Sequence, residues 1–540
     1  MGGFVLTSNS QQESDIVTGS KKVFKKHKII NFGDSGFKAI VFEKNLVDNT
    51  KNYIKDGDDI IIGVGTFNYR SKFGVNALTL ILNDLNNGVS CFDKILGHFN
   101  IITYVKNELK VVTDCSGFLQ LFQVEIGSDL MLSTSFSLLC SIAPNLTLSK
   151  QEVLEYLQTS TTFNNKTIFK EITVSKSASI LSLFPGRNTK TYFTPKYEDI
   201  TYEELLVKVK SYFKQWSGGK IIADLSGGFD TRTLAASLMS SNCNFEFVTN
   251  NRSLDISKDI LVSKKIAKQF NIPLHIAELE NNYLNDTISN VECVYAYELS
   301  RGMDISKRVV NEIYNKANIN DLIFGGWGAE MLRNTHGQQN NVRKLISGFG
   351  YNRFVMPKDI EKEYLDNLED KLIETLNHLQ DYDENFIGEI AFYRFKSKDW
   401  VGSALSARNK YAHWLFPFFD IKLAIPIINL EHKDRNVQKR FIKDLKKEFE
   451  SITFGNGDDF KMIWNKIKRK VKKVMPNTKN NFANSNTDYQ YESVDNQHKL
   501  IYDVTKINKD YLKNIQANRI IPRYDALSVL LNSLESSKLN

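Results

Sequence analysis

The chain has few of the residues that mark disulfide-bonded or metal-binding proteins. Its 540 residues include only 5 cysteines, Cys91, Cys115, Cys140, Cys243 and Cys293, which are far apart and never form a Cys-x-x-Cys pair. This spacing argues against a disulfide framework and a structural zinc site, and it favours a reducing compartment, so we expect a cytoplasmic protein. The 8 histidines are equally scattered and form no His-Glu-x-x-His pattern, so no transition-metal site is evident.

Long apolar runs and a strong charge of one sign are also missing. No segment approaches the roughly 18 apolar residues of a membrane span, and residues 1–15 lack the basic start and apolar core of a secretory signal. The 70 Lys and Arg against 62 Asp and Glu leave a net charge of +8, which is too dilute to require nucleic acid as a partner. The 42% of hydrophobic and 24% of charged residues are those of an ordinary globular protein.

Short apolar runs separated by polar turns dominate the region 1–196. The runs lie at residues 38–43, 59–67, 99–105, 109–114, 119–126 and 129–136. Their alternation, with tight turns at 106–108 and 127–129, predicts antiparallel strands joined by hairpins. One helix is expected over 149–160, with Ser149 as its N-cap and Glu152 as its capping-box partner.

Strands and helices alternate in the region 197–455. Apolar runs predict strands at 220–225, 245–250 and 273–279, and helical patterns surround them at 205–216, 231–241 and 255–271. This alternation predicts βαβ crossovers and a parallel sheet. The pattern is mostly helical from about 300 to 450, and the region 456–540 is expected to be a helical, basic extension with a polar linker near 476–497.

The sharpest motif is SGGFD at 226–230, between a buried strand that ends at Leu225 and a helix expected to begin at Thr231. Two glycines let the backbone approach an anion, and the N–H groups and positive dipole of the first helical turn attract it. Ser226 and Thr231 add hydroxyl donors, and Asp230 adds a carboxylate suited to Mg²⁺ on phosphates. The Walker pattern is absent, so the alternatives are a different phosphate loop or a plain strand-to-helix turn with a capping aspartate.

SGGFDT after a buried strand resembles the pyrophosphate loop of the ATP-pyrophosphatase superfamily. Residues 97–140 resemble the amino-terminal domain of asparagine synthetase-like enzymes, with a Gly-x-Phe strand, a short hairpin and the Asp114-x-Ser116-Gly117 turn. The resemblance covers about 60–450, and the relatives include β-lactam synthetases and lasso-peptide cyclases. It implies a mixed α/β protein: an α+β, Ntn-hydrolase-like αββα sandwich over 1–196, then a doubly wound parallel-sheet ATP-pyrophosphatase domain over 197–455.

The resemblance also implies ATP and Mg²⁺ as cofactors. In 322–334, alignment with the family's Gly-x-Gly-x-Asp segment places Glu330 at the acidic position, where it would hold Mg²⁺ opposite Asp230. Near 413–445, a PFxD segment is matched by Pro417, Phe418 and Asp420, and Lys439 matches the lysine that reaches the phosphates. The implied nucleotide-binding residues are Leu225, Ser226, Gly227, Gly228, Asp230, Thr231, Val248 and Gly326. Without the family, the alternatives are a glycine turn that starts a helix and a solvated lysine on a cationic helix.

The first domain departs from the sequence pattern of the asparagine synthetase-like family. Family members that hydrolyse glutamine carry a nucleophilic cysteine directly after the initiator methionine, whereas this chain has Gly2, and no recognisable glutamine-binding arginine segment follows. We therefore expect a scaffold without glutaminase activity.

The predicted reaction is ATP-dependent, AMP-forming amide ligation by a carbon–nitrogen ligase, between a small-molecule or peptide carboxylate and an amine donor. One alternative is asparagine synthesis or uronic-acid amidation with ammonia or glutamine. The other is a non-catalytic nucleotide-binding relative.

A basic amphipathic helix is expected over 461–475, where one apolar stripe faces seven basic residues. Its stripe can pack on the protein and leave the charges solvated, it can contact an anionic membrane, or it can bind an acidic partner. We favour packing on the protein; nucleic acid is the weakest alternative, because aromatic residues beyond Trp464 are missing.

Overall fold

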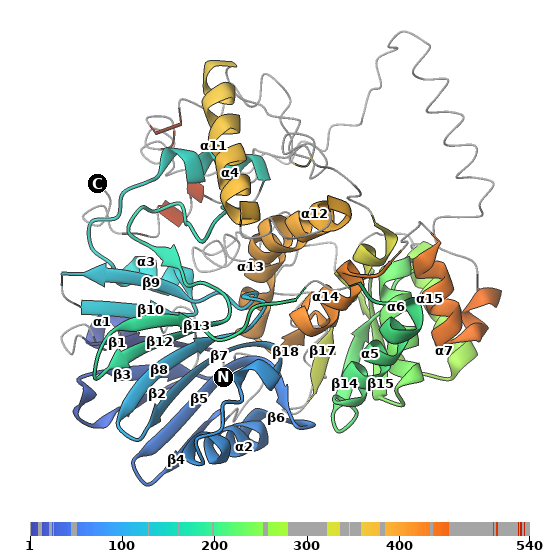
Figure 1. The fold of residues 1–540 in the computed structure, drawn as a ribbon, viewed down its shortest axis with the longest axis horizontal. Coiled ribbons are helices and arrows are strands. Elements are labelled where there is room, and N and C mark those ends of the chain that lie inside the picture. Colours follow the sequence, from blue (N-terminus) through green and yellow to red (C-terminus); the bar gives the residue numbers. More distant parts are fainter. Residues whose placement is uncertain are drawn as a thin grey trace.

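The computed structural model shows two antiparallel sheets in the N-terminal part of the chain and one parallel sheet in the C-terminal part (Figure 1). This mixed α/β architecture confirms the predicted succession of antiparallel strands and parallel sheet. Apart from isolated positions, the structure describes residues 2–8, 13–20, 26–44, 51–127, 129–159, 161–196, 199–251, 258–278, 321–334, 358–377, 384–431 and 436–452. The predicted linker at 476–497 and the predicted basic helix at 461–475 lie outside these ranges.

The first sheet has six antiparallel strands in the order β11-β9-β10-β1-β3-β2. They are β1 (Gly3–Thr7), β2 (His27–Asn31), β3 (Lys38–Phe42), β9 (Phe122–Ile126), β10 (Asp129–Ser133) and β11 (Thr173–Val174). The central strand β1 is paired on both sides and buried along its whole length.

The second sheet has the order β13-β12-β8-β7-β5-β4, and β6 pairs with the end of β5. Its strands are β4 (Tyr53–Asp56), β5 (Asp59–Tyr69), β6 (Lys72–Phe73), β7 (Leu96–Val105), β8 (Glu108–Thr113), β12 (Ser179–Phe184) and β13 (Asn188–Thr191). The turn predicted at 106–108 joins β7 to β8, and both Lys106 and Asn107 adopt left-handed backbone angles there, with φ of 53° and 59°.

Alternating side chains stack these two sheets face to face. Phe4 and Leu6 of β1 share one core with Ile60 and Ile62 of β5, so the facing sides of the sheets exclude water. The outer faces are covered by helices: Ile61 of β5 packs with α2, while the outer side of the first sheet packs with α1 and α3. These helices are α1 (Glu13–Ser20), α2 (Gly74–Asn86) and α3 (Phe136–Ile142). The N-terminal part is therefore a four-layer αββα sandwich.

The third sheet has five parallel strands in the order β16-β15-β14-β17-β18. They are β14 (Lys220–Asp224), β15 (Asn244–Asn251), β16 (Leu274–Glu278), β17 (Leu322–Phe324) and β18 (His413–Leu415). Helix α5 (Tyr202–Lys214) precedes β14, α6 (Phe229–Ser240) joins β14 to β15, and α7 (Lys258–Phe270) joins β15 to β16. The strand order therefore reverses beside β14, which is the connectivity of a doubly wound sheet.

The remaining helices lie above the two halves or between them, except the helix at 437–445, which lies beside α6 (Figure 1). They are α4 (Lys150–Thr159), α11 (Lys358–Asn377), α12 (Glu384–Ala391), the π-helical segment η6 (Phe392–Ser397), α13 (Lys398–Asn409), α14 (Ile421–Ile428) and α15 (Val437–Leu445). Short 3₁₀ helices are η1 (Gly33–Ser35), η2 (Phe92–Lys94), η4 (Ala329–Arg333), η7 (Pro417–Phe419) and η8 (Lys447–Ser451). In the described part of the chain, no helix is both long and apolar enough to cross a bilayer.

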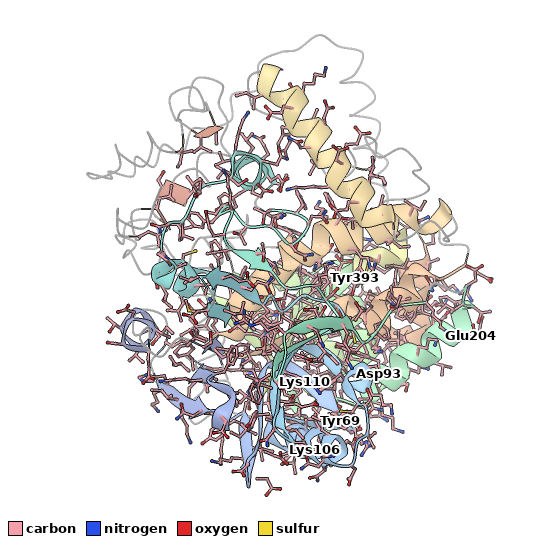
Figure 2. All side chains as sticks on the ribbon, turned by 60° about the vertical axis from the view of Figure 1, so that its left-hand side comes forward. Tyr69, Asp93, Lys106, Lys110, Glu204 and Tyr393 are labelled. Carbon is pink, nitrogen blue, oxygen red and sulfur yellow. The ribbon has the colours of Figure 1, made fainter. Side chains whose placement is uncertain are left out.

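The helix starts show how local sequence signals are realised. At the predicted capping box of α4, the Ser149 hydroxyl donates to the Glu152 carboxylate. Helix α5 begins with a complete capping box, which we did not predict. The Thr201 hydroxyl accepts from the Glu204 backbone N–H, and the Glu204 carboxylate accepts from the Thr201 backbone N–H. Glu204 lies at the edge of the molecule (Figure 2).

Polar side chains also join the sandwich to the parallel-sheet half. Thr66 of β5 donates to the side-chain oxygen of Asn409 at 2.9 Å. Lys44, just after β3, donates to the carbonyls of Asn409 at 2.5 Å and Ala412 at 2.9 Å. Because Lys44 is only 3% exposed, its ammonium group lies within the junction between the two halves.

The burial of Lys44 makes a pH-dependent contribution to stability. Burial lowers its pKa from 10.5 to about 7, so between these pH values the unfolded chain binds more protons than the folded one. The stability of the wild type should therefore rise with pH in this window, and Lys44→Met should remove up to ~1.4 kcal/mol per pH unit of that slope. Denaturant unfolding at pH 7 and pH 9 measures the effect, with the exposed Lys72→Met as control. Equal slopes in the wild type and Lys44→Met would contradict the prediction.

Candidate functional site

The SGGFD loop connects the end of β14 to the start of α6, as predicted. The helix begins at Phe229 with Gly228 as its N-cap, which is two residues earlier than expected, so Asp230 lies in the first helical turn. No side chain caps this helix end. A helix leaves its first N–H groups without helical acceptors, so the partners of the N–H groups at this end come from the loop, from neighbouring elements or from a ligand.

Each of three backbone N–H groups in the loop points at an oxygen atom. The Ser226 N–H donates to the Thr231 hydroxyl at 3.0 Å, and the Gly228 N–H donates to the Ser226 hydroxyl at 3.2 Å. The Gly227 N–H donates to the Asp259 carboxylate of α7 at 3.0 Å. Since Asp259 supplies an anionic oxygen here, it stands in for the kind of group that the loop can hold, such as a phosphate oxygen.

A buried arginine on α6 is hydrogen-bonded to the backbone of the loop. Arg232, on α6, is fully buried and donates to the carbonyl oxygens of Gly227 at 3.4 Å and Ile452 at 2.9 Å. Burial lowers the pKa of Arg232 to about 10, and the cation also adds positive potential beneath the loop. We did not predict Arg232, although it is the one charged residue in the otherwise uncharged stretch 231–238, which was a signal for it.

The second predicted segment leaves the neighbouring strand β17 and runs against the first. A Cβ atom added to Gly326 would lie 2.9 Å from both the N and Cα atoms of Thr231, so only glycine allows this approach. Gly328 has a left-handed backbone with φ of 95°, and its N–H donates to the Glu330 carboxylate at 2.7 Å. Burial and the negative charge of Asp230 raise the pKa of Glu330 to about 7.

Side chains from two other segments, η4 and α15, converge on Asp230. Its carboxylate accepts from Arg333 of η4 at 3.1 Å and from the side-chain amide of Gln438 at 3.0 Å. The same amide of Gln438 lies 3.1 Å from the Ala329 carbonyl, so it ties α15 to the glycine segment. Lys439 follows Gln438, and its Nζ lies 5.9 Å from the ring centroid of Phe229.

The structure thus brings together most of the residues selected from the sequence. Ser226, Gly227, Gly228, Asp230, Thr231, Gly326, Glu330 and Lys439 meet at the carboxyl ends of β14 and β17. Leu225 and Val248 have buried side chains and are joined through the Leu225 N–H and the Val248 carbonyl at 2.8 Å, so only their backbones could face a ligand. Pro417 and Phe418 lie behind the site, where Phe418 packs against Gly328.

Two glycine segments and two carboxylates lie together at the carboxyl edge of the parallel sheet. Ligands of open α/β sheets bind outside the carboxyl ends of the strands where the strand order reverses, and β14 and β17 flank that point here. Among the described residues, no group of three His, Cys, Asp or Glu side chains is placed to hold a metal ion. Asp230 and Glu330 are two carboxylates, which fits Mg²⁺ because this ion takes its remaining ligands from phosphates and water.

Comparisons with known proteins return distant matches only. No protein-family model matches the chain, and no curated protein matches it in sequence. One similar solved structure is the allosteric regulatory enzyme of purine biosynthesis, with 7% identity, a TM-score of 0.26, and coverage of 59% of this chain and 94% of the other. Another is glutamine phosphoribosylpyrophosphate amidotransferase from B. subtilis with ADP and GMP, with 8% identity, a TM-score of 0.24, and coverage of 65% and 89%. Such TM-scores carry no argument, so function rests on the site itself.

The amino end of β1, where a glutaminase of the predicted type would need its cysteine nucleophile, is closed. The Gly2 N–H donates to the Phe42 carbonyl at 2.8 Å. A Cβ atom at Gly2 would lie 2.7 Å from the carbonyl oxygen of Glu43 and 3.0 Å from that of Lys410. Because both neighbours are backbone atoms, this position has no room for a cysteine side chain.

Gly2→Cys is therefore expected to destabilise the protein without creating glutaminase activity. Forcing a side chain against two backbone oxygens should cost about 1–3 kcal/mol, as overpacked cores generally do. Denaturant unfolding and release of glutamate from glutamine measure the two effects, with Gly186→Cys as control because a Cβ atom there meets nothing within 4 Å. A stable Gly2→Cys variant that releases glutamate would overturn this prediction.

Proposed function

We propose that the chain is an ATP-dependent, AMP-forming amide ligase that adenylates a carboxylate substrate and joins it to an amine. The observation that carries the proposal is the convergence of Glu330 and Lys439 on the SGGFD loop, which contains Asp230. These three segments lie far apart in the sequence, yet the loop backbone, the two carboxylates and the lysine together provide the donors and charges that a magnesium-bound triphosphate requires.

The chain's own groups have distinct roles in this proposal. The loop around Gly227 and Gly228 would hold the pyrophosphate portion of ATP through backbone N–H groups, displacing Asp259 from the Gly227 N–H. Asp230 and Glu330 would hold Mg²⁺, which neutralises phosphate charge when bound. Lys439 would stabilise the negative charge that builds on the phosphate oxygens.

The reaction would proceed in two displacements. An oxygen of the substrate carboxylate attacks the α-phosphorus, and the bond from that phosphorus to pyrophosphate breaks. The amine then attacks the acyl carbon, and AMP leaves with the former carboxylate oxygen. Most of the rate enhancement in such a site comes from positioning and from neutralising charge.

The closed amino end of β1 favours an amine taken directly from a substrate over ammonia released from glutamine. A site at Gly2 that excludes a side chain cannot hold the thiol nucleophile of a glutaminase. The second candidate function, amidation with free ammonia, differs only in the nitrogen source, so a panel of amines separates the two.

Product analysis tests the proposal. With a carboxylate that supports exchange of labelled pyrophosphate into ATP, we expect AMP and pyrophosphate in equal amounts and no ADP. Chromatographic quantification of the nucleotides is the measurement. Formation of ADP and orthophosphate would contradict the proposal, and nucleotide binding without exchange across a broad carboxylate panel would support a non-catalytic relative instead.

A further inference from the structure

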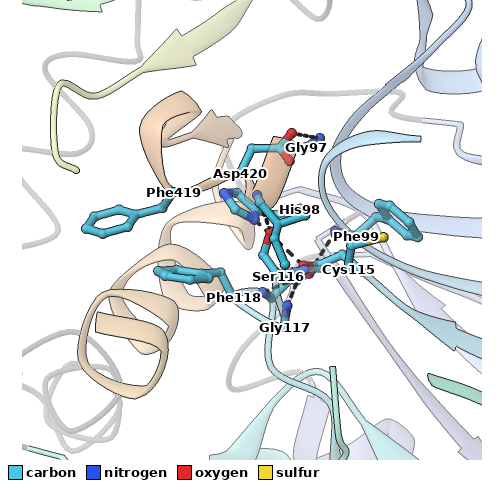
Figure 3. A network of polar contacts seen from close by, with 12 residues as sticks. Gly97, His98, Phe99, Cys115, Ser116, Gly117, Phe118, Phe419 and Asp420 are labelled. Carbon is cyan, nitrogen blue, oxygen red and sulfur yellow. Dashed lines mark hydrogen bonds and ion pairs between the residues drawn. The ribbon is translucent and has the colours of Figure 1, made fainter. Parts of the chain in front are cut away.

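A buried polar network joins the sandwich to the segment 416–420 that lies beneath the candidate site (Figure 3). Gly97 and His98 of β7 and the turn that begins at Asp114 contribute from the sandwich, and Asp420 contributes from the parallel-sheet half. His98 and Asp114 are fully buried, and Asp420 is 2% exposed. Buried groups of this kind are costly to place, so their partners decide what they do.

Asp420 ties three elements together through one carboxylate. It accepts from the Gly97 N–H of β7 at 2.5 Å and from the Tyr212 hydroxyl of α5 at 2.8 Å. It also caps α14 by accepting from the Lys422 N–H at 3.0 Å. Burial raises the pKa of Asp420, while these donors favour its charged form. The start of α14 is thereby fixed to both halves of the molecule.

His98 holds the other end of the same segment. Its Nε2 lies 3.4 Å from the Phe416 carbonyl oxygen, which accepts a hydrogen bond when Nε2 carries the proton. Its Nδ1 lies 3.9 Å from the Asp114 carboxylate. Asp114 accepts from the backbone N–H groups of Ser116 at 2.8 Å and Gly117 at 2.6 Å, so it is held rigidly by its own turn.

Aromatic rings also pack against the segment 416–420. The ring of Phe118 lies 5.4 Å from that of His98 and is stacked on Phe419 with a centroid distance of 5.0 Å. The Tyr393 hydroxyl donates to the Phe419 carbonyl at 3.0 Å. Both ends and the middle of the segment are therefore fixed by residues of the sandwich and of η6.

The far side of the segment supports the glycine loop of the candidate site. A Cβ atom on Gly325 would lie 2.4 Å from the Phe416 ring, and one on Gly328 would lie 2.9 Å from the Cβ of Phe418. The Trp327 ring is stacked on Phe416 with a centroid distance of 4.9 Å. Because these contacts are so close, the position of the loop that carries Gly326 and Glu330 depends directly on the position of the segment 416–420.

We propose that His98 and Asp420 are positioning residues for the ATP site, through which the sandwich sets the distance of the Gly325–Glu330 loop from Asp230. The inference rests on the proposed function. In this proposal the N-terminal sandwich contributes to ligation by positioning the loop, and this role requires no glutaminase activity. His98 touches no reacting atom, so its effect passes through Phe416, Gly325 and Trp327.

Three variants of the full chain test the kinetic consequence. His98→Leu removes the donor to Phe416, His98→Gln keeps an amide nitrogen at the place of Nε2, and Leu132→Ala destabilises the same sandwich from the core between its sheets. In pyrophosphate exchange we expect His98→Leu to lower kcat at least about 10-fold with little change in KM for ATP, because a small misplacement of a catalytic loop is costly. His98→Gln should restore most of the rate, and Leu132→Ala should retain it. Equal losses of kcat in His98→Leu and Leu132→Ala would show that His98 only stabilises the fold.

Hydrogen–deuterium exchange of the same variants without ligand tests the mechanical link by itself. We expect His98→Leu to raise deuterium uptake in peptides that cover 322–334 and 413–424, while His98→Gln and Leu132→Ala leave both near the wild-type level. If the wild type exchanges no pyrophosphate with any carboxylate, the proposed function fails and this experiment alone decides the positioning role. Unchanged uptake at 322–334 in His98→Leu would overturn the inference in either case.

Discussion

Asp230→Asn is expected to lower pyrophosphate exchange by at least about 100-fold while the protein stays folded. Asparagine has nearly the same volume, and its carbonyl oxygen can still accept from Arg333 and from Gln438. What the substitution removes is the negative charge in the first turn of α6, which would bind Mg²⁺ together with Glu330. The loss should be partly relieved at high Mg²⁺, because a weakened site can be refilled by mass action.

The matched control is Asp34→Asn, on an exposed 3₁₀ turn of the sandwich, which should keep wild-type exchange. Circular dichroism and the denaturant midpoint of both variants establish that they are folded. An Asp230→Asn variant that exchanges pyrophosphate at the wild-type rate would remove Asp230 from the site. Loss of exchange in Asp34→Asn as well would show that the assay reports general stability.

Strands with a strong local pattern were predicted well from the sequence. The run at 38–43 became β3, and the run at 59–67 became most of β5, because alternating or continuous apolar residues bounded by turns identify buried strands. Strand β1 was missed, since its apolar run, Phe4 to Leu6, is only three residues long. The short edge strand β13 was missed for the opposite reason: all four of its residues are exposed.

The residues of the candidate site also differ in how far the sequence could predict them. The SGGFD loop was selected because the chemistry of its short glycine motif can be recognised locally, whereas Glu330 was selected only through the resemblance of 322–334 to the Gly-x-Gly-x-Asp segment. Asp259 and Gln438 were not found, since an acid on one helix and an amide on another gain their roles only when α7 and α15 pack beside the loop. Arg333 follows Glu330 by one helical turn, yet its pairing with Asp230 also needs the tertiary fold.

Lys439→Ala should lower the rate of adenylation by about 10²–10³, or ~3–4 kcal/mol, while ATP affinity changes less. A preorganised cation is worth most where charge develops in the transition state, and Lys439 lies beside Phe229, the first residue of α6, which begins within the SGGFD loop. Removing the side chain should leave α15 docked, because the neighbouring Gln438 still holds Asp230 and the Ala329 carbonyl. Lys443→Ala is the control on the same helix, one turn later, where an exposed ammonium pairs with Glu450. Single-turnover kinetics and equilibrium ATP binding separate the two quantities. Equal effects of the two substitutions, or a loss confined to ATP affinity, would show that Lys439 is a solvated surface lysine with no part in the chemistry.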